Sequence, residues 1–121
     1  MLKATCHCGD VTLEVPQAPS TLTNCNCSSC RRLGALWAYY PLGEVRISGH
    51  PEHTDSYVWG DRTLRTVRCK RCGCVTHWEP LAGTDARHMA VNARNFDAWM
   101  LDQNLRIRRF DGAASWRYLD E

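Results

Sequence analysis

The chain has 121 residues, a mass of 13.8 kDa and a formal net charge of +2 at pH 7. A chain of this length can bury one hydrophobic core but rarely two, so we expect a single domain over residues 1–121. The N-terminus has no apolar run of signal-peptide length, and no stretch of about 18 consecutive apolar residues occurs. The sequence therefore gives no support for a membrane span or for secretion, and it predicts a cytoplasmic protein without a membrane partner.

Basic residues gather in two segments, residues 62–71 and 105–110, where they alternate with apolar residues. This alternation is typical of strands with one solvated face, whereas a nucleic-acid-binding surface needs a continuous basic patch. Together with the small net charge, it argues against nucleic acid as a partner.

Short segments rich in β-branched and aromatic residues follow one another along the chain. Residues 4–15 predict two strands around a turn at Gly9-Asp10. Further strands are predicted at residues 36–42, 45–48, 54–59, 63–69 and 75–79. Turns rich in Gly, Pro and Asp separate these segments, and this rhythm predicts a mainly β fold.

Two short helices are also expected. The first begins after Cys27, with Ser28 or Ser29 as its N-cap and residues 31–36 following, although Gly34 weakens it. The second covers residues 95–102.

The eight cysteines fall into three groups with short internal spacings. In chain order these are Cys6-x-Cys8, then Cys25-x-Cys27-x-x-Cys30, then Cys69-x-x-Cys72 with Cys74 just beyond. In a strand, residues i and i+2 point to the same face about 6.6 Å apart, so a C-x-C pair presents two sulfur atoms side by side. Because cytosolic thiols stay reduced, we expect metal binding rather than disulfides.

The first and third groups together can form a closed zinc site. Two sulfurs bound to tetrahedral zinc lie less than about 4 Å apart, a distance that both kinds of pair can reach. Cys6 and Cys8 with Cys69 and Cys72 would then make a structural centre of four thiolates, and Gly73 permits the sharp turn after Cys72. Such a centre would join two distant segments and stabilise a small domain.

The middle group is left with three ligands, Cys25, Cys27 and Cys30. Catalytic zinc commonly has three protein ligands and an open fourth position, so the spacing predicts a second, catalytic Zn²⁺. Three thiolates favour a soft fourth ligand, such as the thiolate of a substrate. Two alternatives remain open: a second closed site completed by Cys74 or a histidine, and a role for Cys74 in place of Cys72 or as a buried free thiol.

Three segments, "TCHCGDV", "CNCSSCRRLGA" and "VRCKRCGC", resemble in order the motifs of the glutathione-dependent formaldehyde-activating enzyme family, the Gfa or CENP-V type domain. The resemblance implies an Mss4-like fold of stacked antiparallel sheets. It also implies a structural zinc on Cys6, Cys8, Cys69 and Cys72 and a catalytic zinc on Cys25, Cys27 and Cys30. The implied activity is that of a carbon–sulfur lyase, whose founding member joins formaldehyde and glutathione into S-hydroxymethylglutathione. Cys74 departs from the pattern, because a serine is usual at that position.

Other residue types near these motifs could take part in binding or catalysis. Arg31 and Arg32 follow Cys30 closely enough to lie at the rim of the site, where a guanidinium could bind a carboxylate of glutathione, although solvated arginines are more common. His77 and His88 lie on predicted strands and could act as acid–base groups, although packed or exposed histidines are more common there.

The aromatic residues Trp37, Tyr39 and Tyr40 could wall a pocket, but we rank core packing first. The sequence therefore predicts a zinc-dependent enzyme acting on a small thiol or its adduct. The competing interpretation is a non-catalytic zinc domain for protein or nucleic-acid contact.

Overall fold

The computed structural model describes residues 2–101 and 105–120. The strands are β1 (Leu2–Thr5), β2 (Thr12–Val15), β3 (Thr21–Cys25), β4 (Trp37–Pro41), β5 (Arg46–Ser48), β6 (Thr54–Tyr57), β7 (Leu64–Cys69), β8 (Val75–Pro80), β9 (His88–Asn92) and β10 (Arg106–Phe110). The helical elements are α1 (Ser28–Leu33) and the 3-10 turns η1 (Ala93–Asn95) and η2 (Ala98–Met100). The mainly β prediction is confirmed, and no helix in the described ranges is both long and apolar enough to cross a membrane.

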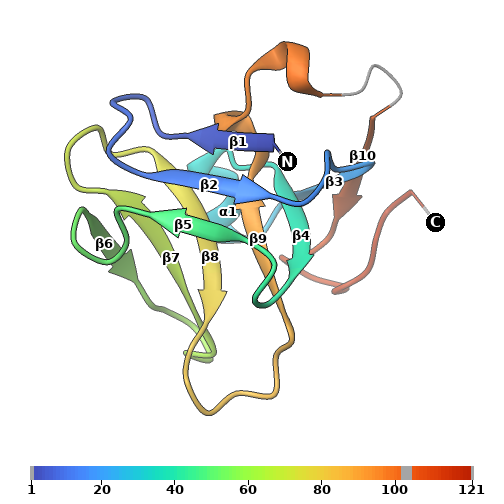
Figure 1. Cartoon of the computed structure of the whole chain (residues 1–121). Helices are drawn as coiled ribbons and strands as arrows, with labels where there is room; N and C mark the ends of the chain where they lie inside the picture. The colour runs from blue at the N-terminus through green and yellow to red at the C-terminus, as the bar shows by residue number, and fades with distance from the viewer. Residues whose placement is uncertain (1, 102–104, 121) are drawn as a thin grey trace.

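The strands form two sheets. A small sheet has the order β1-β2-β5, and a large one has the order β10-β3-β4-β9-β8-β7-β6. Figure 1 shows the small sheet crossing in front of β7, β8 and β9. Neighbouring strands pair antiparallel except for β10 and β3, which pair in parallel, so the large sheet is mixed.

The two faces of the large sheet have separate roles, because side chains alternate along each strand. On β4, Ala38 and Tyr40 belong to the main core, together with Met89 and Val91 of β9. Leu13 and Val15 of the small sheet complete this core and are fully buried. The opposite face of the same strands carries a second cluster, which includes Trp37 and Ala90.

The first predicted helix exists, but it begins earlier than expected. Cys27, rather than Ser28 or Ser29, is the N-cap of α1, and its sulfur accepts a hydrogen bond from the Cys30 backbone N–H at 3.3 Å. Gly34 ends the helix at φ 67°, a left-handed conformation that glycine adopts without a Cβ penalty. Residues 35 and 36 therefore lie outside the helix.

The second predicted helix, residues 95–102, is replaced by the short turns η1 and η2. Asn92 caps η1 by accepting a hydrogen bond from the Arg94 N–H, and Phe96 lies between the turns in an extended conformation that interrupts helical winding. Residue 102 lies outside the described residues.

A buried polar network fastens the loop after β5 to β8. His77 is fully buried, and its Nε2 lies 2.6 Å from Oε1 of Glu79, while Nε2 of His50 lies 2.8 Å from the same oxygen. These three residues are close enough to hold a metal ion, yet both distances are ordinary hydrogen-bond lengths. Burial lowers the pKa of His77, and the hydrogen bond from His77 lowers the pKa of Glu79. We therefore interpret this cluster as a structural hydrogen-bond network, in which His77 serves packing rather than proton transfer.

Replacing Glu79 by Gln is expected to lower the free energy of unfolding at pH 7 by about 1–2 kcal/mol, because a charged acceptor shared by two histidines is lost. Since the pKa of Glu79 is lowered on folding, its contribution is present above its ordinary value of 4.5 and is lost as the pH falls through the folded-state pKa. Urea unfolding from pH 7 to well below pH 4.5 should show the wild type and the variant converging as the pH falls through the folded-state pKa of Glu79. The exposed Glu52→Gln is the control, and a difference that did not change with pH would contradict this account.

Candidate functional site

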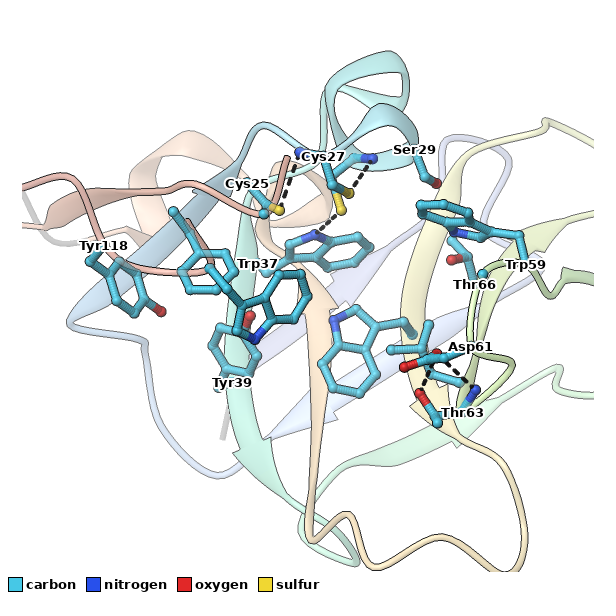
Figure 2. A pocket seen from close by; sticks show the side chains of 17 residues that line it. Cys25, Cys27, Ser29, Trp37, Tyr39, Trp59, Asp61, Thr63, Thr66 and Tyr118 are labelled. Atoms are coloured by element: carbon cyan, nitrogen blue, oxygen red, sulfur yellow. Dashed lines mark hydrogen bonds between the residues drawn. The ribbon is translucent and has the colours of Figure 1, made fainter. Parts of the chain in front are cut away.

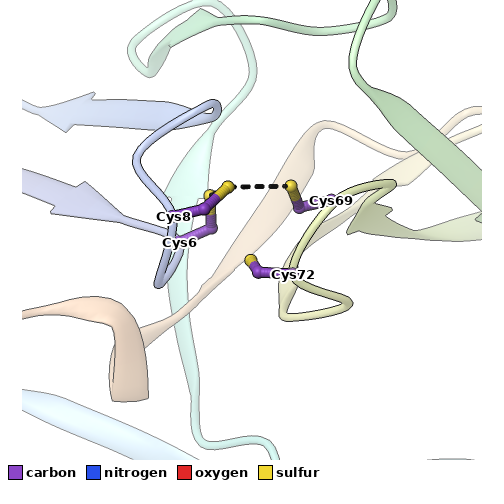
Figure 3. Close-up of side chains that lie close together, drawn as sticks. All are labelled: Cys6, Cys8, Cys69 and Cys72. Carbon is purple, nitrogen blue, oxygen red and sulfur yellow. Dashed lines mark hydrogen bonds between the residues drawn. The ribbon is translucent and has the colours of Figure 1, made fainter.

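Four cysteines come together from two turns that lie far apart in the sequence. Cys6 and Cys8 lie in the turn between β1 and β2, whereas Cys69 ends β7 and Cys72 lies in the turn before β8 (Figure 3). Their sulfur atoms all lie within 4.8 Å of one another. Both turns are closed by the same kind of backbone bond, from Gly9 N to Cys6 O at 3.1 Å and from Gly73 N to Cys69 O at 3.0 Å.

The sulfur separations in this group match a tetrahedral metal site. The Sγ atoms of Cys6 and Cys8 lie 3.7 Å apart, and those of Cys8 and Cys69 lie 3.6 Å apart. Tetrahedral zinc with four bonds of about 2.3 Å places its sulfurs about 3.8 Å apart, whereas a disulfide needs about 2.05 Å. All eight cysteines are free, so the structure contains no disulfide among them. The four-cysteine group could hold a metal ion.

The second cysteine group lies where β3 meets α1. Cys25 ends the strand, Cys27 caps the helix and Cys30 lies in its first turn, and their sulfur atoms lie within 4.8 Å of one another. Backbone N–H groups point at two of the sulfurs, from Cys27 to Cys25 at 3.5 Å and from Cys30 to Cys27 at 3.3 Å. The third sulfur, that of Cys30, accepts the indole N–H of Trp37 at 3.3 Å. Donors of this kind favour the thiolate form that a metal needs.

Proximity also separates the proton affinities of these thiols. A hydrogen bond from Cys30 lowers the pKa of Cys25 to about 6, and the same contact, with burial, raises the pKa of Cys30. Of these two thiols, Cys25 is therefore the one that loses its proton more readily.

The three-cysteine group gains no fourth protein ligand among the described residues. Within residues 2–101 and 105–120, no further ligand atom of a Cys, His, Asp or Glu lies within 4.8 Å of all three sulfurs. Cys74 does not complete it, because that side chain packs against the main core on the opposite face of the large sheet. The structure therefore brings neither Cys74 nor a histidine of the described residues to the three-cysteine group as a fourth ligand.

A pocket of about 570 Å³ opens beside this group (Figure 2). Its floor is the second face of the large sheet, where Trp37 and Tyr39 of β4 and Trp78 of β8 line the cavity. The rings of Tyr39 and Trp78 meet edge to face with their centroids 6.0 Å apart. Trp37 and Tyr39 thus line the pocket, although the sequence favoured core packing for all three aromatic residues. Tyr40 does lie in the core, and its hydroxyl donates a hydrogen bond to Gln17 O.

The wall of the pocket nearest the cysteines comes from the C-terminal segment, which the sequence analysis missed. Phe110, Gly112, Trp116 and Tyr118 line the cavity. The segment is held against the β3–α1 connection by Asn26, whose Nδ2 donates to Asp111 Oδ1 at 3.0 Å and whose Oδ1 accepts from Ala113 N at 2.9 Å. The parallel pairing of β10 with β3 brings the C-terminal segment next to the cysteines. No local pattern in the sequence predicts such a pairing.

The arginines and histidines named from the sequence lie elsewhere. Arg31 and Arg32 are exposed on α1, and Arg32 donates a hydrogen bond to Ser28 O of its own helix. Neither arginine lines the pocket, and neither does His77 or His88. The residues gathered around the three sulfurs are therefore mainly aromatic.

Comparison with known proteins agrees with this geometry. The sequence model of the family described as glutathione-dependent formaldehyde-activating enzyme matches residues 1–108. A crystal structure of a Rhodobacter sphaeroides protein is similar, with 33% sequence identity and a TM-score of 0.69, over 80% of this chain and 89% of that one. The chain belongs to the glutathione-dependent formaldehyde-activating enzyme family.

The family match covers both cysteine groups but ends before the C-terminal wall. Phe110, Gly112, Trp116 and Tyr118 all lie beyond residue 108. In this member of the glutathione-dependent formaldehyde-activating enzyme family, the potential metal ligands are therefore within the matched region, whereas one side of the pocket is outside it.

Replacing Trp37 by Phe is expected to weaken metal binding at the three-cysteine group by about tenfold, because the smaller phenyl ring lacks the N–H donor to Cys30. Competition with a coloured chelator would measure this affinity. Trp78→Phe, which makes the same change to another ring of the pocket, is the matched control. Equal loss of affinity in both variants would contradict a specific role for the indole N–H.

Replacing Gly112 by Ala is expected to disturb the same group, because a Cβ at this position would lie 2.6 Å from Cys25 Sγ and 3.2 Å from Cys27 Cβ. We expect one metal ion per chain to be lost or bound at least about tenfold more weakly, since ligand positions must shift. Metal analysis with circular dichroism would test this, and the four-cysteine group is the internal control. Unchanged metal binding at the three-cysteine group would contradict this expectation.

Proposed function

We propose that the chain is a zinc-dependent carbon–sulfur lyase acting on the adduct of a small thiol and an aldehyde, such as S-hydroxymethylglutathione. The observation that supports this is the three-cysteine group, whose sulfurs open into a pocket and gain no fourth ligand among the described residues. Membership of the glutathione-dependent formaldehyde-activating enzyme family supports the same thiol chemistry. The free cysteines favour a reducing compartment such as the cytoplasm.

Two zinc ions with different roles fit the two groups. Cys6, Cys8, Cys69 and Cys72 would hold a structural ion in a closed site, and Cys25, Cys27 and Cys30 would hold a catalytic one. Soft thiolate donors and the sulfur separations of the first group agree with zinc. When bound at the second group, zinc would supply an open position that lowers the pKa of a substrate thiol.

The reaction needs a proton and an electron pair to move in a defined way. In the lyase direction, the hydroxyl of the adduct gives its proton to solvent water and its oxygen forms the carbonyl, while the C–S bond breaks and its electron pair goes to sulfur. The products are an aldehyde and a thiolate. In the synthetic direction, the thiolate attacks the carbonyl carbon and the carbonyl oxygen gains the proton.

The side chains of the pocket support both directions. Burial of the phenol raises the pKa of Tyr39 to about 12, so this group stays protonated near neutral pH and can donate a hydrogen bond to a substrate oxygen. The aromatic rings of the pocket shield such a contact only partly, because Tyr39, Trp59 and Trp116 remain exposed to solvent. The N–H groups of Cys27, Cys30 and Trp37 hold the three sulfurs in place.

Serine replacements at the two cysteine groups should separate their roles. Cys30→Ser is expected to remove one zinc and lower turnover by at least about a hundredfold, with a stability loss of about 1–2 kcal/mol. Cys69→Ser, at the buried link between the hairpins, is expected to lower the free energy of unfolding by more than about 4 kcal/mol. Metal analysis, urea unfolding and release of formaldehyde from S-hydroxymethylglutathione measure these effects.

The matched control is Cys74→Ser, which belongs to neither group and should keep both zinc ions and turnover. Two results would contradict the proposal: equal unfolding by Cys30→Ser and Cys69→Ser, or X-ray absorption with four sulfurs at both metals. Either would favour a non-catalytic zinc domain for macromolecular contact.

A further inference from the structure

The pocket beside the three-cysteine group has an unusual balance of side chains. Seven aromatic residues line it, and Asp61 is the one charged side chain among the described lining residues other than the cysteines. No Lys or Arg belongs to the described lining. A site built for a molecule with carboxylates normally offers guanidinium or ammonium groups to pair with them.

The rings are arranged as a cage rather than as scattered contacts. The Phe110 ring packs edge to face against Trp116 and against Tyr118, with centroid distances of 5.0 Å in each case. Trp59 and Trp116 remain 40% and 70% exposed, although both line the pocket. Large rings held open to solvent around a cavity are typical of ligand-binding surfaces, and their negative faces attract apolar groups and cations.

The charges of the site also disfavour a ligand with carboxylates, because they are negative. Three thiolates with one Zn²⁺ would carry a net charge of about −1, and Asp61 adds another negative charge at the exposed rim. Oδ1 of Asp61 accepts hydrogen bonds from the N–H and hydroxyl of Thr63, at 3.3 and 2.9 Å, which holds the carboxylate in place. A carboxylate that entered this pocket would therefore meet two like charges.

The nearby arginines do not reverse this preference. The guanidinium of Arg108 lies 3.7 Å from the centroid of the Tyr118 ring and is not part of the pocket lining. Arg31 and Arg32, which the sequence marked as binders of a carboxylate, are exposed on α1. Glutathione carries two carboxylates, and the described lining of this pocket pairs with neither.

We propose that this site selects a carboxylate-free thiol, or its aldehyde adduct, with an apolar body and a protonated amine, and that glutathione is one of its poorer ligands. The sulfur would face the three cysteines, the body would lie among the rings, and the amine would pair with Asp61. This inference rests on the proposed function of the same site. It concerns which thiol is used, and it leaves the reaction unchanged.

Binding of matched thiols to the full-length protein with cobalt in place of zinc tests the inference. The probes are glutathione against glutathione diethyl ester, and 6-aminohexane-1-thiol against 6-mercaptohexanoate, compared at equal thiolate concentration. New sulfur-to-cobalt charge-transfer absorption reports each dissociation constant. We expect the ester to bind at least about tenfold more tightly than glutathione, because both carboxylates are neutralised. We expect 6-aminohexane-1-thiol to bind more tightly than 6-mercaptohexanoate by a similar factor, because an ammonium group replaces the carboxylate.

Asp61→Asn should reduce the preference for the amino thiol at least about threefold, since the amide keeps the acceptor for Thr63 but loses the charge. Asp55→Asn, an exposed carboxylate on β6 that does not line the pocket, is the control and should leave the preference unchanged. If no thiol produced new absorption, the proposed function itself would fail. If glutathione bound as tightly as its ester, or if Asp61→Asn left the preference intact, the selectivity would be overturned while the proposed reaction stood.

Discussion

The convergence of four sulfur atoms from two distant hairpins is the constraint on which the rest of the structure depends. Cys8 and Cys69 are separated by 61 positions, yet their sulfurs lie 3.6 Å apart. Four thiolates at such distances repel one another, so a bound cation would turn this repulsion into a cross-link that exists only in the folded chain. The cross-link would fix the small sheet against β7 and β8, and so define which face of the large sheet is buried.

Once one face of the large sheet is covered, strand alternation makes the other face available for a site. Ala38 and Tyr40 point into the core, so Trp37 and Tyr39 must point to the opposite side. The register of β4, β9 and β8 then places Ala90 between Tyr39 and Trp78, and this small residue leaves room for the two rings to meet. A pocket floor on a paired sheet is rigid, which suits ligands that must hold a fixed geometry.

The parts of this molecule that sequence predicts are those governed by local spacing. The pairs Cys6 and Cys8, and Cys69 and Cys72, need only the geometry of a strand and a tight turn, so their meeting could be expected. The start of α1 was misplaced because cysteine is not among the usual N-caps, and here the Cys27 sulfur takes that role. The C-terminal wall could not be expected, because the parallel pairing of β10 with β3 is long-range and leaves no local pattern.

The two cysteine groups and one wall of the pocket are thus encoded in different parts of the chain. The cysteine groups lie within the segment that matches the family, whereas the wall that carries Phe110, Trp116 and Tyr118 follows it. Gly112 joins the two, because its missing side chain allows the wall to approach Cys25 closely. A wall of this kind can change its rings and charges while the sulfurs keep their positions.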